Sequence, residues 1–88
     1  MTRLIFSIRF KRMYRKLPAQ RQRICDERIR LFAKDPRHPL LNMHSLGGEY
    51  AGCFSINITG DIRAVWCIIG VDAANFIAIG THSELYGS

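Results

Sequence analysis

Four polar side chains between residues 44 and 82 have the chemistry needed to cleave RNA: His44, Asp61, Arg63 and His82. An imidazole can take or give a proton near neutral pH, a carboxylate can take one, and a guanidinium binds phosphate oxygens through its planar fork. RNA supplies its own nucleophile, the ribose 2′-hydroxyl, so a base, an acid and a cation near the phosphorus are sufficient. In this scheme Asp61 or His44 accepts the hydroxyl proton and His82 protonates the leaving 5′-oxygen. Arg63 stabilises the charge on the phosphorane, and a 2′,3′-cyclic phosphate and a 5′-hydroxyl result.

Arg63 is unusual because it interrupts the apolar stretch from Ile62 to Ile69. A charge within a strand is costly unless it is solvated or paired, so this side chain is expected to face an open, wet surface. A guanidinium in that position suits a phosphate. The alternative is a structural ion pair with Asp61 or Glu49.

His82 lies in the tetrapeptide T-H-S-E (residues 81–84), which has the S/T-x-x-E form of a helix capping box. It is therefore expected to begin a short helical turn directly after the last strand. The free N–H groups of such a turn attract anions, which favours a phosphate next to His82. The alternatives are structural roles for His82 and for the loop residue His44, and a simple turn role for Asp61.

Cysteine and histidine spacings argue against a metal centre. The chain has no C-x₂-C and no H-x₃₋₅-H pattern, and it has no glycine-rich phosphate loop, so neither a metal nor a nucleotide cofactor is expected. Cys25, Cys53 and Cys67 are odd in number, widely spaced and flanked by apolar residues. This usage predicts reduced, buried thiols without a disulfide, as in a cytoplasmic protein.

Charge is distributed unevenly along the 88 residues, which carry a formal net charge of +6. All but one of the 13 lysines and arginines precede residue 38, and the remainder of the chain is slightly acidic. A basic half indicates a polyanionic partner, such as a nucleic acid or an acidic protein segment. Ordinary solvated helix faces are the alternative explanation.

The basic half has the pattern of one strand and two helices. Leu4–Ile8 alternates as a strand does, and from Arg9 the apolar residues recur with helical spacing up to Leu17. Pro18 ends this helix and can begin a second one, which the amphipathic pattern extends to Lys34. Two adjacent amphipathic helices must cover an apolar surface.

The remaining chain has the pattern of three strands, over 50–58, 62–69 and 75–79, with a tight turn over 59–61. The order β-α-α-β-β-β predicts an α+β fold, with the helical hairpin on one face of a small antiparallel sheet. The other face, carrying Ser55, Asn57 and Arg63, is expected to remain open as a shallow trough. Residues 1–88 suffice for one domain, and no apolar run is long enough to cross a membrane.

Three segments together resemble the bacterial RelE superfamily of toxins: H-S-L-G-G-E-Y-A-G (residues 44–52), G-D-I-R (60–63) and G-T-H-S-E-L-Y-G (80–87). The closing phrase is most similar to the YafQ branch, and the order of expected elements also agrees with the superfamily. The resemblance implies a cytoplasmic toxin of a type II toxin–antitoxin module. Such a toxin cleaves mRNA in the ribosomal A site without a cofactor and is held inactive in a hetero-oligomer with its antitoxin.

Matched position by position, the resemblance implies roles for the polar residues. His82 matches the principal catalytic histidine, and His44 matches a second histidine used in proton transfer. Asp61 matches a catalytic acidic residue. Arg63 matches a phosphate-binding arginine on the sheet, and Tyr86 matches an aromatic residue beside the site that can stack on a base.

Two positions depart from the YafQ-like pattern, which has an aspartate and a further histidine where this chain has Ser55 and Asn57. We expect both side chains to bind substrate through hydrogen bonds. Two other functions remain open: a non-nuclease toxin similar to the ParE toxins, which act on DNA gyrase, and a plain RNA-binding module with structural histidines. The pair of histidines together with Arg63 favours the nuclease.

Overall fold

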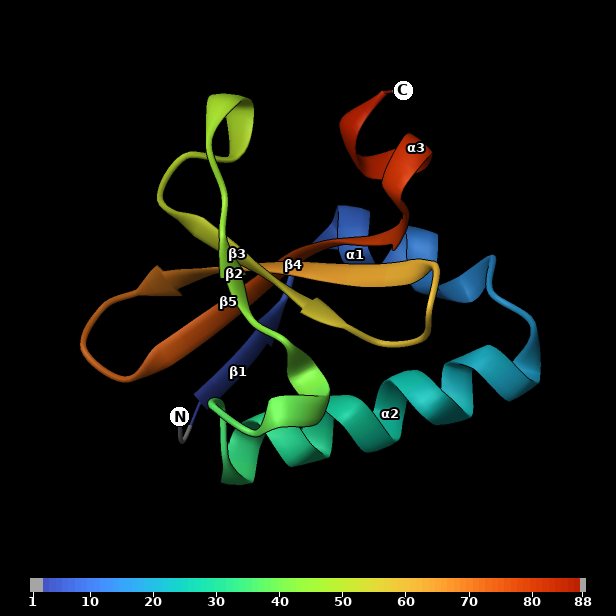
Figure 1. Ribbon diagram of the computed structural model, residues 1–88, viewed down its shortest axis with the longest axis horizontal. Coiled ribbons are helices and arrows are strands. Elements are labelled where there is room, and N and C mark those ends of the chain that lie inside the picture. Colours follow the sequence, from blue (N-terminus) through green and yellow to red (C-terminus); the bar gives the residue numbers. More distant parts are fainter. Residues whose placement is uncertain (1–2, 88) are drawn as a thin grey trace.

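The computed structural model describes residues 3–87, which form a five-stranded sheet and three α-helices (Figure 1). The elements follow in the order β1 (Arg3–Phe6), α1 (Ile8–Arg15), α2 (Ala19–Lys34), β2 (His44–Ser45), β3 (Cys53–Asn57), β4 (Ile62–Ile69), β5 (Ala73–Thr81) and α3 (His82–Tyr86). Two short 3₁₀-helices flank β2, namely η1 (Pro39–Leu41) and η2 (Gly48–Tyr50). The expected α+β architecture is confirmed.

The sheet has the strand order β1-β5-β4-β3-β2. The pairings β2–β3, β3–β4 and β4–β5 are antiparallel, as expected, but β1 pairs with β5 in parallel, so the sheet is mixed. A parallel pair requires a long crossover, and here both helices and three strands intervene between β1 and β5. The alternation of apolar residues predicts a strand but carries no information about its direction.

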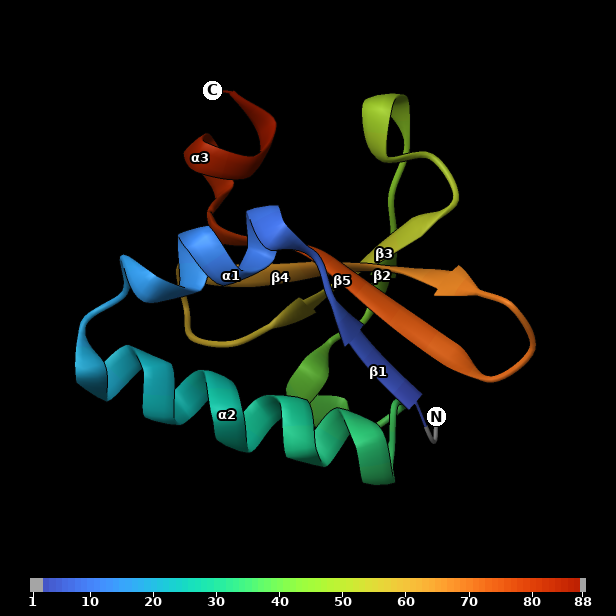
Figure 2. The ribbon, with the colours of Figure 1, turned by 180° about the vertical axis from the view of Figure 1, so that it is seen from behind.

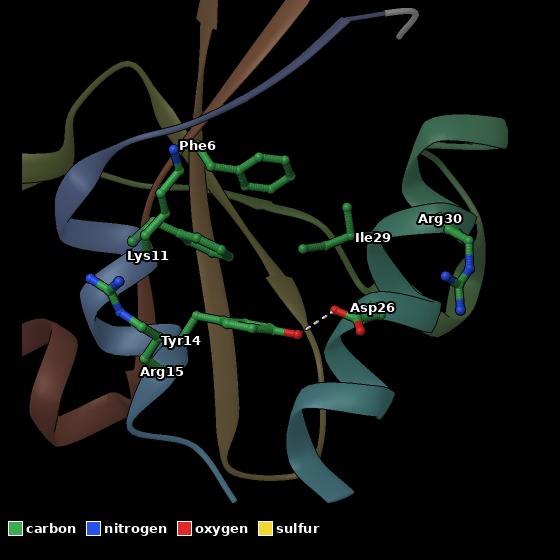
Figure 3. A pocket seen from close by; sticks show the side chains of 8 residues that line it. Phe6, Lys11, Tyr14, Arg15, Asp26, Ile29 and Arg30 are labelled. Carbon is green, nitrogen blue, oxygen red and sulfur yellow. Dashed lines mark hydrogen bonds between the residues drawn. The ribbon is translucent and has the colours of Figure 1, made fainter. Parts of the chain in front are cut away.

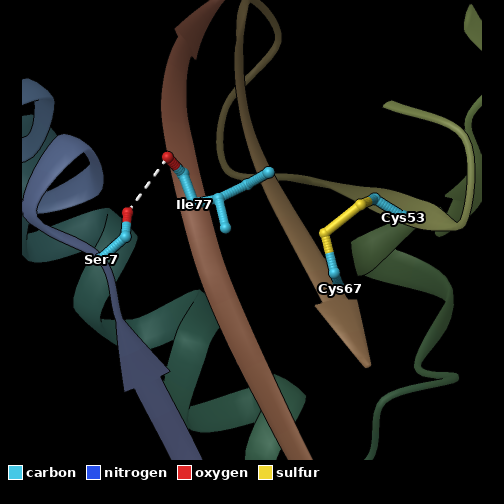
Figure 4. Close-up of a disulfide and its surroundings, with 4 residues drawn as sticks. All are labelled: Ser7, Cys53, Cys67 and Ile77. Atoms are coloured by element: carbon cyan, nitrogen blue, oxygen red, sulfur yellow. Dashed lines mark hydrogen bonds between the residues drawn. A yellow bond between two sulfur atoms is a disulfide. The ribbon is translucent and has the colours of Figure 1, made fainter. Parts of the chain in front are cut away.

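The first helix begins one residue earlier than the sequence pattern indicates. The Ser7 Oγ accepts a hydrogen bond from the Phe10 N–H at 3.0 Å, which makes Ser7 the N-cap. The same hydroxyl donates to the Ile77 carbonyl on β5 at 3.3 Å (Figure 4). Ile8, expected to end the first strand, is instead the first residue of α1 and is exposed.

The two helices share one core with the sheet. From α1, Phe10 packs edge-on against Phe76 of β5, with ring centroids 5.8 Å apart. From α2, Phe32 packs edge-on against both Phe76 and Trp66 of β4, at 5.4 and 4.9 Å. Aromatic rings in this geometry bury large areas and add an electrostatic edge-to-face attraction. The helical hairpin therefore covers the apolar side of the sheet.

The opposite face of the sheet is less open than expected. A second, smaller cluster lies there, formed by Tyr50 of η2, Val65 of β4, Ala78 of β5 and Leu85 of α3. Both α3 and the loop that carries η2 rise from this face, while α2 lies on the other side (Figures 1 and 2). The short helix α3 and η2 therefore cover part of the predicted trough.

The cysteine prediction is correct for one residue and wrong for two. Cys25 of α2 is a free, fully buried thiol, as expected. Cys53 and Cys67 form a disulfide that joins β3 and β4 (Figure 4). They are direct partners in the antiparallel ladder with Cα atoms 4.3 Å apart, so the pairing register brings together two thiols that are 14 residues apart in sequence.

Candidate active site

A hollow of about 380 Å³ lies on the α3 side of the sheet. Two walls enclose it, one from β2 and the following loop and one from α3, and strands β3 and β4 form its floor. The residues that line it are His44, Leu46, Gly47, Ser55, Arg63, His82 and Tyr86. Five of the seven residues singled out by the sequence therefore come together in one place.

Strand register explains why residues so distant in sequence meet here. His44 is paired with Ser55 across β2–β3, and Arg63 is paired with Asn57 across β3–β4 and with Gly80 across β4–β5. Directly paired residues project from the same face of a sheet. The side chains of β2, β3 and β4 are thus displayed on one surface.

Arg63 is half-buried at the floor of the hollow and is held by the β3–β4 turn. Its Nη1 donates to the Gly60 carbonyl at 3.1 Å and more weakly to the Thr59 carbonyl at 3.4 Å. These carbonyls orient the guanidinium without neutralising its charge. Within residues 3–87, the ion pair with Asp61 or Glu49 that was the alternative role for Arg63 does not form.

His82 reaches the hollow because a capping box ends β5 and starts α3. The Thr81 Oγ1 accepts from the Glu84 N–H at 3.2 Å, and a Glu84 carboxylate oxygen accepts from the Thr81 N–H at 2.8 Å. The predicted capping box is confirmed. It places His82 at the first helical position, with its side chain exposed to solvent at the mouth of the hollow.

The turn into α3 leaves little room for a side chain at Gly80. A Cβ atom on Gly80 would lie 2.8 Å from the Glu84 Oε1 and 3.2 Å from the Glu84 Cβ, both closer than ordinary contacts. Gly80 also lies directly opposite Arg63 in the sheet. The glycine therefore allows the capping carboxylate to fold back over the strand.

Three aromatic rings support the α3 wall. The His82 ring packs edge-on against Tyr86 with centroids 4.6 Å apart, and Tyr86 packs edge-on against the buried Tyr50 at 5.8 Å. The Arg9 Nη2 donates to the Tyr50 Oη at 3.1 Å. These rings connect η2, α3 and α1 across the face of the sheet.

Two residues singled out by the sequence do not line the hollow. The carboxylate of Asp61 is 71% exposed and lies 3.8 Å from the Arg21 guanidinium of α2. Asn57 projects from the same face as Arg63, but its Oδ1 is buried and has no hydrogen-bond partner among residues 3–87. The tight turn aims Asp61 at the helix rather than at the two histidines.

Sequence reasoning did not single out Leu46 and Gly47, which complete the β2 wall, nor Arg9 and Tyr50 beneath the α3 wall. The motif over residues 44–52 contains Leu46, Gly47 and Tyr50. The signal that could have identified them is an aromatic residue close in sequence to a histidine. Arg9 gave no signal, because it is one of many basic residues in the first part of the chain.

A second hollow, of about 500 Å³, lies between α1 and α2. Apolar residues of β1, α1 and α2 form its floor, and Lys11, Arg15 and Arg30 lie at its rim (Figure 3). The Tyr14 hydroxyl donates to the Asp26 carboxylate at 2.7 Å and joins the helices at one end. This hydrogen bond, followed by burial, raises the pKa of Tyr14 to about 12. This second hollow, called the α1–α2 groove below, contains no histidine.

Two features are absent from residues 3–87. No three or more of the His, Cys, Asp and Glu side chains gather closely enough to hold a metal ion. In the same part of the chain, every helix is too short or too polar to span a bilayer.

Comparison with known proteins identifies the fold. No protein-family model matches the chain, and no curated protein matches its sequence. Among solved structures, YafQ from Escherichia coli superposes with a TM-score of 0.80 at 16% identity, covering 99% of this chain and 100% of that one. A YoeB/ParE toxin from Agrobacterium tumefaciens has a TM-score of 0.76 at 23% identity, covering 91% and 98%.

A chain of the Escherichia coli DinJ–YafQ toxin–antitoxin complex is similar too, with a TM-score of 0.77 at 17% identity over 99% of this chain and 100% of that one. The resemblance noted in the three sequence motifs thus extends to the whole architecture. This chain has the fold of the RelE-like toxins, with YafQ among its structural neighbours.

Proposed function

We propose that the protein is a metal-independent endoribonuclease toxin that cleaves mRNA on the ribosome. The observation that carries the proposal is the meeting of His44, Arg63 and His82 around one hollow. These side chains supply a base, a cation and an acid, which are the three groups that 2′-hydroxyl attack on a phosphodiester requires. The RelE-like fold supports the toxin assignment by analogy.

In the proposed mechanism His44 takes the proton of the 2′-hydroxyl and His82 protonates the departing 5′-oxygen. The two histidines line the hollow from different elements, β2 and α3, and the mechanism uses them as base and acid on either side of the phosphorus. Each positioned proton transfer contributes about 10²–10⁴-fold to the rate. Arg63 on the floor stabilises the charge that develops on the phosphorane oxygens.

Asp61 is not given a proton-transfer step in this mechanism. Its carboxylate is paired with Arg21, outside the hollow. We propose instead that Asp61 stabilises the β3–β4 turn, whose carbonyls orient Arg63. This assignment differs from the catalytic role implied by the family resemblance, and it is testable by a single substitution.

Substrate contacts fall to the remaining residues of the hollow. Tyr86 presents an aromatic ring at the mouth, where an unpaired base can stack, a contact worth about 1–3 kcal/mol in other proteins. Ser55 lines the floor of the hollow, where its hydroxyl can hydrogen-bond the ribose or phosphate. Asn57 is paired with Arg63 outside the lining of the hollow, and we propose that its buried Oδ1, which has no hydrogen-bond partner among residues 3–87, accepts from a ribose hydroxyl when substrate binds.

The ribosome and an antitoxin are the proposed partners. The basic N-terminal half suits ribosomal RNA, and binding through phosphate contacts weakens strongly as salt concentration rises. The α1–α2 groove suits an antitoxin segment, because an apolar floor beneath a cationic rim complements an amphipathic segment with acidic flanks. Such a module acts in the cytoplasm.

The decisive experiment is translation of a defined message in a purified system, followed by mapping of the 5′ ends and analysis of the end groups. We expect the wild-type protein to cut the message and leave a 2′,3′-cyclic phosphate and a 5′-hydroxyl, and His82→Ala or Arg63→Ala to leave it intact. Uncut message with blocked DNA supercoiling by gyrase would favour the ParE-like alternative. RNA binding and growth unaffected by His82→Ala would favour a plain RNA-binding module.

A further inference from the structure

We propose that Tyr50 is a positioning residue for His82 and acts through the ring of Tyr86. The inference rests on the proposed nuclease function and adds to it a group outside the hollow. Tyr50 is a buried aromatic residue of η2, in a different part of the chain from α3. The residues involved are Arg9, Tyr50, Tyr86 and His82.

The α3 wall needs support from elsewhere because it is very short. The helix has five residues, His82–Tyr86, and a helix of this length is not stable by itself. Its capping box fixes the backbone of the first turn, but not the side-chain torsions of His82, which is exposed. The imidazole therefore depends on neighbouring side chains for its orientation.

Tyr86 is the neighbour that restrains the imidazole directly. Its ring centroid lies 4.6 Å from that of His82, with the ring planes inclined at 63°. These residues are four apart, so one turn of helix brings them together on the same side. The orientation of His82 is thus no better defined than that of Tyr86, which is itself only half-buried.

Tyr50 restrains Tyr86 from the other side. Its ring is 6% exposed and meets the Tyr86 ring nearly at a right angle, with centroids 5.8 Å apart and an interplanar angle of 84°. A buried ring packed between strands and a helix has few alternative rotamers. Tyr50 is therefore a fixed surface against which the α3 wall of the hollow is set.

Arg9 holds the phenol end of Tyr50. The Arg9 Nη2 donates to the Tyr50 Oη at 3.1 Å, and the N-cap of the same helix, Ser7, donates to the Ile77 carbonyl at 3.3 Å. Ile77 lies on β5, the strand that runs into α3. The contacts thus form a closed circuit from β5 through α1, Tyr50 and Tyr86 back to His82.

The experiment compares three variants that weaken this circuit at different points. Tyr50→Leu removes the supporting ring, Tyr50→Phe keeps the ring but loses the acceptor for Arg9, and Arg9→Met removes the donor from an exposed position. Phe54→Leu is the matched control, because Phe54 is a partly buried ring that stacks on Trp66 on the opposite face of the sheet.

Two readouts separate positioning from simple folding. The first is the side-chain NMR signal of His82 in the free protein, which the ring current of Tyr86 displaces. We expect Tyr50→Leu to move this signal toward that of an unstructured histidine, Tyr50→Phe to restore most of the displacement, and Phe54→Leu to leave it unchanged. The second readout is cleavage on the ribosome, where Tyr50→Leu should lower kcat about tenfold with KM nearly unchanged.

The NMR readout does not depend on the nuclease proposal. If the wild-type protein cuts no RNA, the proposed function fails, and the His82 signal alone still decides whether Tyr50 orients that ring. An unchanged His82 signal in Tyr50→Leu would overturn the inference. It would also be overturned if Tyr50→Leu and Phe54→Leu, compared at equal folded fraction, lost the same amount of kcat. A signal shifted by Arg9→Met in the same direction as by Tyr50→Leu would extend support to the whole circuit.

Discussion

The two hollows of the molecule differ in how they are built. The candidate active site is assembled from β2, β3, β4 and α3, and its lining includes two histidines and one arginine. The α1–α2 groove is formed by neighbouring elements of the N-terminal half, with an apolar floor and cations at its rim. One hollow carries groups that can move protons, and the other carries groups suited to docking. In the proposed function, catalysis and antitoxin binding would therefore use separate surfaces of this small domain.

The largest expected effect tests the chemical assignment of the first hollow. His82→Ala or Arg63→Ala should reduce cleavage by at least about 10²-fold, since each removes a group that acts in the transition state. Asp61→Asn should change cleavage by less than about threefold, because it removes only an exposed ion pair. The measurement is the rate of message cleavage on purified ribosomes. A loss with Asp61→Asn as large as that with His82→Ala would restore Asp61 to the catalytic set.

The next effect concerns the disulfide that joins β3 and β4, the strands beneath the same hollow. Reduction of the Cys53–Cys67 cross-link, or Cys53→Ser with Cys67→Ser, should lower the free energy of unfolding by about 2–3 kcal/mol, because the unfolded chain gains the entropy of an open loop. Urea unfolding with and without reductant measures this difference. Cleavage by the reduced folded protein should persist, since the β3–β4 ladder still sets the positions of Ser55 and Arg63.

The double cysteine variant is its own control for the reductant. Its stability should not change when reductant is added, whereas that of the wild-type protein should fall. Equal free energies of unfolding for the oxidised and reduced wild-type protein would show that the cross-link does not stabilise the fold.

A smaller effect is expected at the junction between β5 and α3. Gly80→Ala should lower stability by about 1 kcal/mol, because the added methyl group forces the Glu84 carboxylate out of the capping box. Gly60→Ala is the matched control, since a Cβ there meets no atom within 4 Å. Thermal unfolding measures both variants. Equal melting temperatures for the two would mean that Glu84 moves without cost.

A comparable effect belongs to the α1–α2 groove and depends on pH. The folded protein keeps the Tyr14 phenol protonated up to a pKa of about 12, while the unfolded chain releases this proton near the ordinary value of 10.0. The contribution of Tyr14 to stability is therefore fully retained below pH 10 and should fall as the pH rises toward about 12. Tyr14→Phe should remove this part of the decline and cost about 1 kcal/mol at neutral pH, through the lost hydrogen bond to Asp26.

Cys25 contributes to the same alkaline decline and must be separated from Tyr14. Burial, and secondarily the charge of Asp26, raises the pKa of the Cys25 thiol from 9.0 to about 12. Cys25→Ala in the Tyr14→Phe background should flatten the remaining pH dependence, as followed by urea unfolding between pH 8 and pH 12. A profile identical in all variants would contradict both assignments.

Local sequence patterns predicted most of the elements well. The helix expected over 18–34 is α2 (Ala19–Lys34), and the strand expected over 62–69 is β4 (Ile62–Ile69). The capping box before α3 was also readable from four residues. These features depend on periodicity and on short hydrogen bonds, both of which are encoded by near neighbours in sequence.

The errors concern contacts between distant segments. Ile8 fits a strand alternation, but Ser7 caps a helix there with the help of the Ile77 carbonyl of β5. β1 lies parallel to β5, and Cys53 faces Cys67 across a ladder. No single segment contains the information on register or direction that decides such pairings.

The candidate site shows the same difference between local and long-range information. By itself the sequence determined which groups are available for chemistry, namely two histidines, an arginine and a carboxylate, and the local turn that exposes His82. Only the tertiary structure decided which of them meet: strand register gathers His44, Arg63 and His82, while the β3–β4 turn directs Asp61 to Arg21 on α2. The physical reason is that side-chain chemistry is a property of the residue, whereas proximity depends on pairing between strands far apart in the chain.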